Sequence, residues 1–402
     1  MKSFLNKTRA HAARPKLSER PSMQHWIRLS AAAGACLFSV AAVKAGDIEA
    51  YGVLDTYLEA YSNGDGTTTR LSSGGASPSC YGLRGEEQLA DGLKAFFALE
   101  GGILVDQGTS TPDSPAASEY IFQRHAYVGL AGDFGRVSFG YQYTPTFIAL
   151  ASMDPAGFSL GSAMGTFSSP TARGVNGGAA SDLTSRSANA VSYQSPKLGN
   201  FVFTLFAGLG EKEKTANDVS STRGNYYGGS ARYMNGALTS VLAFGIHKAQ
   251  FNRDADGHDY SGNDYQVDFA VNYDFGFVKP ALNFAWKKGN DRSSGAFPAA
   301  FQSENVFVSQ AGFSAPVAGG RWMASVAYAR NSTTEDADAL SAGTRYEYPL
   351  SKKTFVYTGA IAVWNEDRAD YSLSGGGGST AGIPTVMGKN ASTFFAGINT
   401  RF

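Results

Sequence analysis

The chain has 402 residues, 34 basic and 34 acidic side chains, 48 glycines and an aromatic content of 13%. Beyond residue 45 it has no run of 18 apolar residues, which excludes transmembrane helices of ordinary length. A glycine- and aromatic-rich chain without long apolar runs is typical of a soluble β protein or of a membrane β-barrel.

The first 45 residues have the pattern of a secretory signal peptide. A basic segment ends at Arg28, an apolar run covers 29–43, and Val43-Lys44-Ala45 forms a small-x-small cleavage site. Met23 lies closer to this run than Met1 and is an alternative start. Removing 1–45 leaves 26 of the 34 basic and 33 of the 34 acidic residues, a net charge of −7. We expect one mature domain, 46–402, and this acidic balance gives no support to nucleic-acid binding.

Apolar and polar side chains alternate with period two in the mature chain. In the segment 265–274, Val267 and Phe269 alternate with Asp268 and Ala270. Successive side chains of a strand point to opposite faces, so each such segment has one apolar and one polar face. The segments are longer than typical soluble strands, and aromatic residues gather near their ends, as at the interfaces of a membrane barrel.

The connectors alternate between short and long, as they do in bacterial barrels with short periplasmic turns and long outer loops. This pattern predicts an all-β fold, a sixteen-stranded antiparallel transmembrane β-barrel with both termini on the periplasmic side. Backbone groups in a bilayer must pair within the protein, so the sheet must close. The expected strands begin near residues 47, 80, 92, 119, 134, 186, 198, 224, 237, 262, 277, 301, 320, 340, 353 and 390.

Several stretches resemble the Gram-negative general porin family in its β-proteobacterial form. They run in order along the mature chain: Tyr51-Gly-Val-Leu-Asp55, Tyr81–Ala95 followed by Leu99-Glu100, Arg124–Leu130 with Gly135–Gly140, Arg186–Pro196 and Phe395–Phe402. The resemblance implies a homotrimer in the outer membrane, in contact with lipid and lipopolysaccharide, that passes small hydrophilic solutes. It also implies that the third loop, about 144–185, folds into the lumen and narrows it. No cofactor or metal is expected.

In this family, arginines on the barrel wall face acids on the third loop, and the resemblance extends this arrangement to the present chain. Opposed charges in a narrow gap orient water and polar solutes and obstruct apolar ones. Arg124 matches one wall arginine. The other candidates for the pore constriction are Arg84, Lys94 and Arg186 on the lumen side of their strands, and Asp154 and Asp182 on the loop.

Two positions depart from the family pattern. Cys80 and Tyr141 stand where the family usually has arginine, so the basic half of the constriction is expected to be weaker. Together with the net charge of −7 and the lumen-side acids Asp55, Glu59 and Glu100, this favours mild cation selectivity. Cys80 is the only cysteine of the mature chain and is interpreted as an inert lumen residue.

The final strand places Phe394, Ile398 and Phe402 on one face. The resemblance makes the terminal Phe402 the signal for the outer-membrane assembly machinery.

Two other functions were weighed against a general diffusion channel. An enzymatic barrel is disfavoured, because the one Gly-x-Ser-x-Gly match, Gly157–Gly161, lies in the third loop without the strand-to-helix turn that the motif requires. A solute-specific channel of the same fold is the remaining alternative. An aromatic ladder along the loop would favour it, but the loop offers only Phe147, Phe158 and Phe167.

Overall fold

A computed structural model describes residues 48–110, 121–168, 185–211, 224–248, 263–289, 305–373, 383 and 386–402. The predicted signal peptide, 1–45, and the candidate Asp182 lie outside these residues. The elements are β1 (Ile48–Ser62), β2 (Thr67–Ser73), β3 (Cys80–Ala90), β4 (Leu93–Leu104), β5 (Thr109–Ser110), β6 (His125–Gly132), β7 (Gly135–Tyr143), α2 (Pro145–Met153), α3 (Ala163–Ser168), β8 (Arg186–Gln194), β9 (Phe201–Gly208), β10 (Tyr226–Asn235), β11 (Leu238–Lys248), β12 (Asn263–Tyr273), β13 (Lys279–Lys288), β14 (Asn305–Val317), β15 (Gly320–Asn331), β16 (Ala339–Pro349), β17 (Thr354–Asn365) and β18 (Ala391–Arg401).

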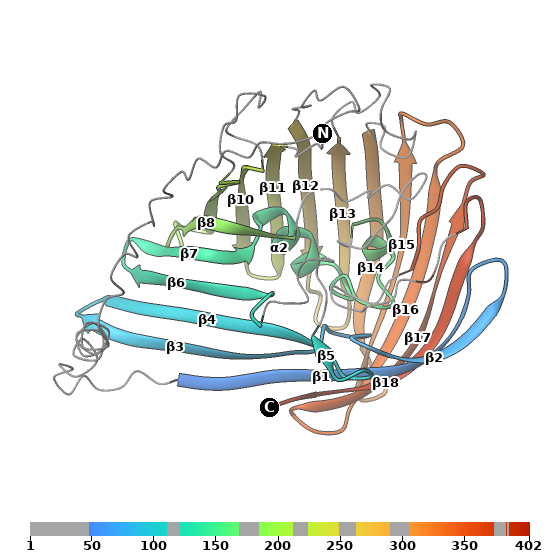
Figure 1. The fold of residues 1–402 in the computed structure, drawn as a ribbon, viewed down its shortest axis with the longest axis horizontal. Coiled ribbons are helices and arrows are strands. Elements are labelled where there is room, and N and C mark those ends of the chain that lie inside the picture. Colours follow the sequence, from blue (N-terminus) through green and yellow to red (C-terminus); the bar gives the residue numbers. More distant parts are fainter. Residues whose placement is uncertain are drawn as a thin grey trace, which may run out of the picture. The chain divides into compact units, whose positions relative to one another are not determined.

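The strands form a single closed antiparallel sheet (Figure 1). Each of the longer strands pairs with its neighbour in the chain, and β1 pairs with β18 to close the ring. The strands β2 and β3 pair with successive halves of β1 and together count as one position in the ring. The two-residue strand β5 only extends the wall beside β4. The described strands therefore occupy sixteen positions. The predicted sixteen-stranded antiparallel barrel is confirmed.

One expected connector, about 62–79, contains a strand. Its residues Thr67–Ser73 form β2, which pairs with the second half of β1, whereas β3 pairs with the first half. Between β2 and β3, the backbone N–H groups of Gly75 and Ala76 donate hydrogen bonds of 2.7 and 3.2 Å to the carboxylate of Asp55. This buried carboxylate on β1 explains why the chain leaves the sheet and returns to it at the same edge.

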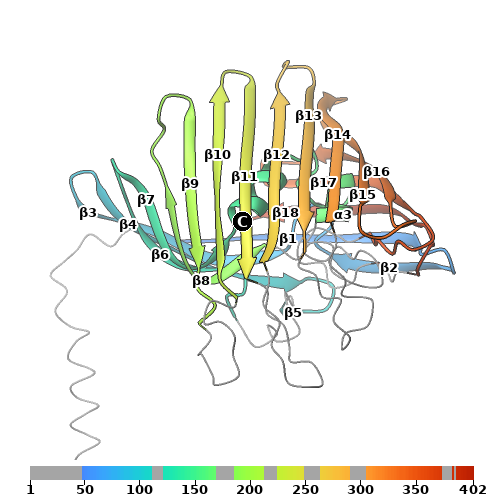
Figure 2. The ribbon, with the colours of Figure 1, turned by 90° about the horizontal axis from the view of Figure 1, so that it is seen from above.

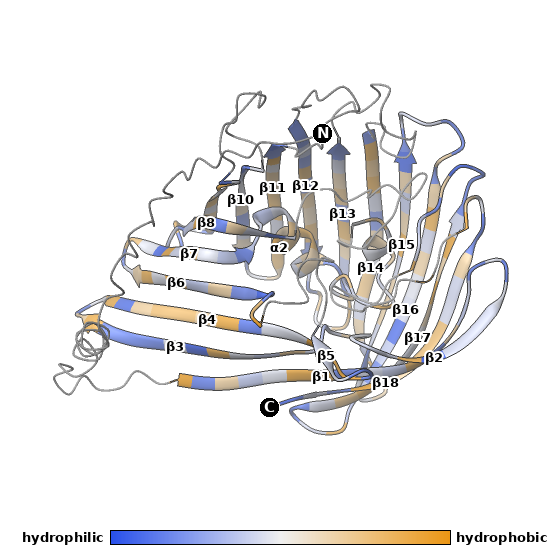
Figure 3. Cartoon of the chain, in the orientation of Figure 1, coloured by the Kyte–Doolittle hydropathy of each residue, from blue (hydrophilic) through white to orange (hydrophobic). Residues whose placement is uncertain are grey.

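The period-two pattern of the sequence corresponds to side chains that alternately face outward and inward along each strand. On β12, Val267 and Phe269 are 41% and 43% exposed on the outer face, while Asp268 and Ala270 are fully buried inside. Figure 3 shows this alternation as bands of apolar and polar colour along the wall. Apolar side chains thus face outward, which is the arrangement that a bilayer requires.

Short turns join the strands at one end of the barrel. Several contain a glycine in the left-handed region, such as Gly92 (φ 74°) and Gly276 (φ 83°), which turns the chain without a Cβ clash. In outer-membrane barrels short turns face the periplasm, and we assign this end accordingly.

The chain that follows β7 runs inside the ring of strands. The helix α2 packs against β9 to β13 and α3 against β14 to β16, and in Figure 2 both green helical ribbons lie behind this part of the wall. The predicted inward fold of the third loop is therefore confirmed for residues 144–168. No helix in the described ranges is long and apolar enough to cross a membrane.

Candidate functional site: the pore wall and its third loop

The third loop starts with a helix whose beginning and end are encoded locally. Thr144 is the N-cap in an extended conformation, and Pro145 occupies the first turn, where its missing N–H costs nothing. The helix ends at Met153, and the backbone N–H of the C-cap residue Asp154 donates to the Leu150 carbonyl at 3.0 Å. Ala149, Leu150 and Met153 are buried, so α2 presents apolar side chains to the barrel wall. The described part of the loop, 144–168, is therefore packed against the wall.

Asp154, the best loop candidate for the acidic side of the constriction, is buried between the loop and the barrel wall. Its Oδ1 accepts the backbone N–H groups of Ala156 (2.9 Å) and Phe158 (3.2 Å). Its Oδ2 accepts hydrogen bonds from Ser162 Oγ (2.9 Å) and from Gln310 Nε2 of β14 (2.8 Å). Burial raises the pKa of Asp154, although these four donors favour the charged form. The carboxyl fastens the loop to the wall and does not present an open negative charge to the lumen.

Arg345 on β16 is the second group that fastens the loop. Its buried guanidinium donates to Ser159 Oγ and the Leu160 carbonyl, both at 2.5 Å, and to the Ala156 carbonyl at 3.3 Å. It also forms an ion pair with Glu347 at 2.9 Å. The Ser159 of the Gly-x-Ser-x-Gly match is thus held by Arg345, and it donates to the Ala156 carbonyl. Its observed contacts are those of a loop anchor.

Arg124 and Arg186 do come together, around one tyrosine. Arg124 donates to Glu100 Oε1 at 2.7 Å and to the Tyr143 hydroxyl at 3.0 Å. Arg186 donates to the same hydroxyl at 2.5 Å, and its guanidinium lies 4.2 Å from the centre of the Tyr143 ring. Tyr51 donates to the other oxygen of Glu100 at 2.9 Å. We name these five residues the arginine cluster.

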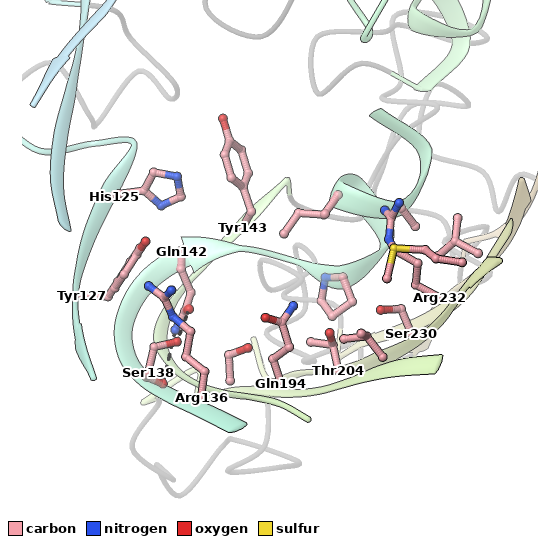
Figure 4. Close-up of a pocket in the computed structure, with 17 residues that line it drawn as sticks. His125, Tyr127, Arg136, Ser138, Gln142, Tyr143, Gln194, Thr204, Ser230 and Arg232 are labelled. Carbon is pink, nitrogen blue, oxygen red and sulfur yellow. Dashed lines mark hydrogen bonds between the residues drawn. The ribbon is translucent and has the colours of Figure 1, made fainter. Parts of the chain in front are cut away.

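A cavity of about 470 Å³ lies between α2 and the strands β6 to β11 (Figure 4). Two arginines, Arg136 and Arg232, line it together with neutral polar side chains, and no carboxylate is among its lining residues. Arg136 stacks over the Phe96 ring at 3.6 Å. Arg232 donates to Ser152 Oγ and to Met153 Sδ of α2. The other polar lining residues are His125, Tyr127, Ser138, Gln142, Tyr143, Ser192, Gln194, Thr204 and Ser230.

Arg84 and Lys94 lie toward the short-turn end, and of the arginine cluster only Tyr51 contacts Arg84. Arg84 forms an exposed ion pair with Glu49 at 2.8 Å and stacks on Tyr51. Lys94 pairs with Glu86 at 3.3 Å, also exposed. The structure therefore does not bring these two cations to the third loop.

The two positions that depart from the family pattern are both on the wall. Cys80 is a buried free thiol at the start of β3. Tyr141 is half-buried beside a shift of register between β7 and β8. Gly140 precedes it with φ 128°, where a Cβ would clash with the Ala126 carbonyl oxygen. The shift of register between β7 and β8 therefore requires a glycine at position 140.

Three functional candidates were missed from the sequence: Arg136, Arg232 and Arg345. Each is a charged residue at an inward-facing position of a strand, so the alternation of the strand sequence could have pointed to it. Their partners on α2 and on the loop lie far away in the chain, so the contacts themselves could not be inferred.

Comparisons with known proteins agree with this architecture. Residues 29–368 match the model of the Gram-negative porin family. Outer membrane porin protein 32 of Delftia acidovorans is 30% identical over 355 residues, which cover 86% of this chain and 92% of that protein. An outer membrane porin protein of Bordetella pertussis is 29% identical over 319 residues, 71% of this chain and 77% of that protein.

Among solved structures, a porin from Comamonas acidovorans described as anion-selective matches with a TM-score of 0.74 and 27% identity, covering 89% of this chain and 100% of that one. The closed barrel, its inward loop and these matches agree. The chain belongs to the Gram-negative porin family and forms a channel through the outer membrane for passive diffusion of small hydrophilic solutes and ions.

Proposed function

We propose that this channel prefers small anions to cations. The observation that carries the proposal is the cavity under α2, where the guanidinium groups of Arg136 and Arg232 meet no acid among the lining residues. A fixed charge in a narrow lumen with low-dielectric walls concentrates ions of the opposite sign. The proposal reverses the expectation of mild cation selectivity, which rested on net charge, on two missing arginines and on the acids Asp55, Glu59 and Glu100.

The inner acids support this proposal because their charges already have partners. Glu100 is paired with Arg124 and accepts from Tyr51. Glu59 is paired with Arg70 at 2.6 Å. Asp154 is buried against the wall with a raised pKa. Net charge counts all of these as negative, whereas Glu100 and Glu59 each have an arginine partner and the Asp154 carboxyl is turned to the wall. The anion selectivity described for the Comamonas acidovorans porin agrees with this assignment.

We assign Arg124 and Arg186 a secondary role beside this cavity. Both guanidinium groups donate to the Tyr143 hydroxyl, and Tyr143 lines the cavity itself. Arg84 and Lys94 are each paired with an acid and exposed, and exposed pairs are strongly screened by salt. They contribute little to selectivity in this proposal.

The test is the reversal potential in a KCl gradient across planar bilayers. The wild-type channel should show the sign of chloride preference, and Arg136→Gln/Arg232→Gln should move the potential toward the cation side. Lys197→Gln/Lys389→Gln is the matched control: it removes two exposed positive charges that do not line the cavity, so the potential should change little. A cation-selective wild type, or a double variant with unchanged potential, contradicts the proposal.

The general diffusion channel and the solute-specific channel give different currents in the same apparatus. A general channel shows ohmic steps that no single solute blocks, and a specific channel shows small currents blocked by one solute. The broad cavity lined by mixed polar groups favours the general channel.

We further propose that the protein works as a homotrimer in contact with outer-membrane lipid and lipopolysaccharide. The apolar side chains along the outer face support burial in a bilayer. Conductance steps in groups of three, together with chemical cross-linking of folded protein, test this assembly; single steps and an uncross-linked monomer contradict it.

A further inference from the structure

A second cavity, of about 390 Å³, lies at the short-turn end of β15 to β18. Two turns and the end of the last strand border this open cavity: the turn before β15, the turn between β16 and β17, and Arg401 of β18. No residue of this cavity belongs to the one under α2. The volume falls within the range of small-molecule pockets.

The lining of this cavity is strongly basic. Arg321, Lys352, Lys353 and Arg401 face one acid, Glu347. That acid is already engaged, since Arg321 lies 2.8 Å from its Oε2 and Arg345 lies 2.9 Å from its Oε1. The cavity therefore holds an uncompensated surplus of positive charge among its lining residues.

The turn that carries the lysines is ordered by Ser351. The Ser351 hydroxyl accepts the backbone N–H groups of Lys353 (3.2 Å) and Thr354 (3.0 Å). The Ser351 N–H donates to the Thr354 carbonyl at 3.0 Å, and the Arg401 N–H donates to the Lys353 carbonyl at 2.9 Å. These bonds hold the backbone of the cationic residues on neighbouring strand ends, which lowers the entropy cost of gathering them around one ligand.

We propose that this cavity, which we name the mouth site, binds phosphate-type anions with two or more charges, with inorganic pyrophosphate as the simplest example. Ammonium and guanidinium groups are the usual partners of phosphate oxygens, and several cations together favour a multivalent anion over chloride. The volume leaves room for a diphosphate or a phosphomonoester. The mouth site is separate from the anion preference of the pore, because it uses different residues at the periplasmic end.

The test is a calorimetric titration of the folded, detergent-solubilised full chain with pyrophosphate at low ionic strength. We expect saturable binding, with one site per chain. In Lys352→Gln/Lys353→Gln the dissociation constant should rise roughly five- to thirtyfold, since each lost exposed charge contact makes a modest contribution. The matched control is Lys197→Gln/Lys279→Gln, which removes two exposed lysines at the same end that do not line the cavity, one in the turn after β8 and one at the start of β13.

Loss of affinity in the first double variant but not in the control supports the mouth site. Absence of saturable binding by the wild type overturns it, as does an equal loss in both variants, which indicates only general charge attraction. The reversal potential of the same proteins in KCl separates the two proposals. A cation-selective pore that still binds pyrophosphate at the mouth site contradicts the pore proposal alone.

Discussion

Arg345 should decide whether the third loop stays against the wall. This guanidinium is 2% exposed and donates to three acceptors of the loop, at Ser159, Leu160 and Ala156. Replacing it by alanine removes all of these donors and leaves the two carbonyl groups without this partner. Glu347 keeps its ion pair with Arg321, so the substitution does not leave an isolated acid.

The magnitude follows from the two short bonds, each from a charged donor. Hydrogen bonds of this kind contribute about 1.5–3 kcal/mol each, which gives about 3–6 kcal/mol for the attachment. At about 1.4 kcal/mol per factor of ten, the population with this stretch of loop detached should rise by roughly two to four orders of magnitude. The contacts of Asp154 with Gln310 remain, so the barrel itself should still form.

Single-channel recording of Arg345→Ala should show larger open-channel noise and a higher mean conductance than the wild type. Arg345→Lys should lie between them, because a single ammonium cannot reproduce the fork of donors. Arg321→Ala is the control: it removes the other partner of Glu347 without touching the loop. If Arg345→Ala folds and its noise and conductance equal those of the wild type, the loop does not depend on this attachment.

Three further substitutions test two close approaches in the fold and the terminal phenylalanine. A Cβ on Gly343 would lie 2.5 Å from the Gly161 carbonyl oxygen, so Gly343→Val should displace the loop and change single-channel conductance, whereas Ala342→Val on the outer face should not. Phe402→Ala should lower the amount of folded protein in the outer membrane without abolishing refolding in detergent, as measured by heat-modifiable gel mobility. Gly52→Val should have a milder effect of the same kind, because an added Cβ would clash with the Phe402 ring and displace it. Normal membrane levels for Phe402→Ala would contradict the assembly signal.

The number of strands, and the side of the sheet that each residue faces, could be predicted because both depend on local sequence patterns. The alternation of Val267 and Phe269 with Asp268 and Ala270 reports which side each residue faces, whatever the neighbouring strand is. The final strand behaves in the same way, with Phe394 exposed on the outer face.

The position of the third loop relative to the wall could not be read in this way. Asp154 was expected to face the pore, but its carboxyl is turned to Gln310, a partner far along the chain. Arg84 has the lumen parity that was predicted, yet parity does not tell at what height along the barrel a side chain lies. Both differences arise from tertiary packing, which a single-strand pattern does not contain.

The pairing of β1 with β18 has a consequence for biogenesis. Its ten register pairs join residues from opposite ends of the mature chain, so the ring closes only when the last strand is present. A chain lacking β18 would expose the edges of β1 and β17, and each unpaired backbone group in hydrocarbon costs several kcal/mol. Closure therefore acts as a check on completeness: a truncated product has no stable position in the bilayer and stays open to proteolysis.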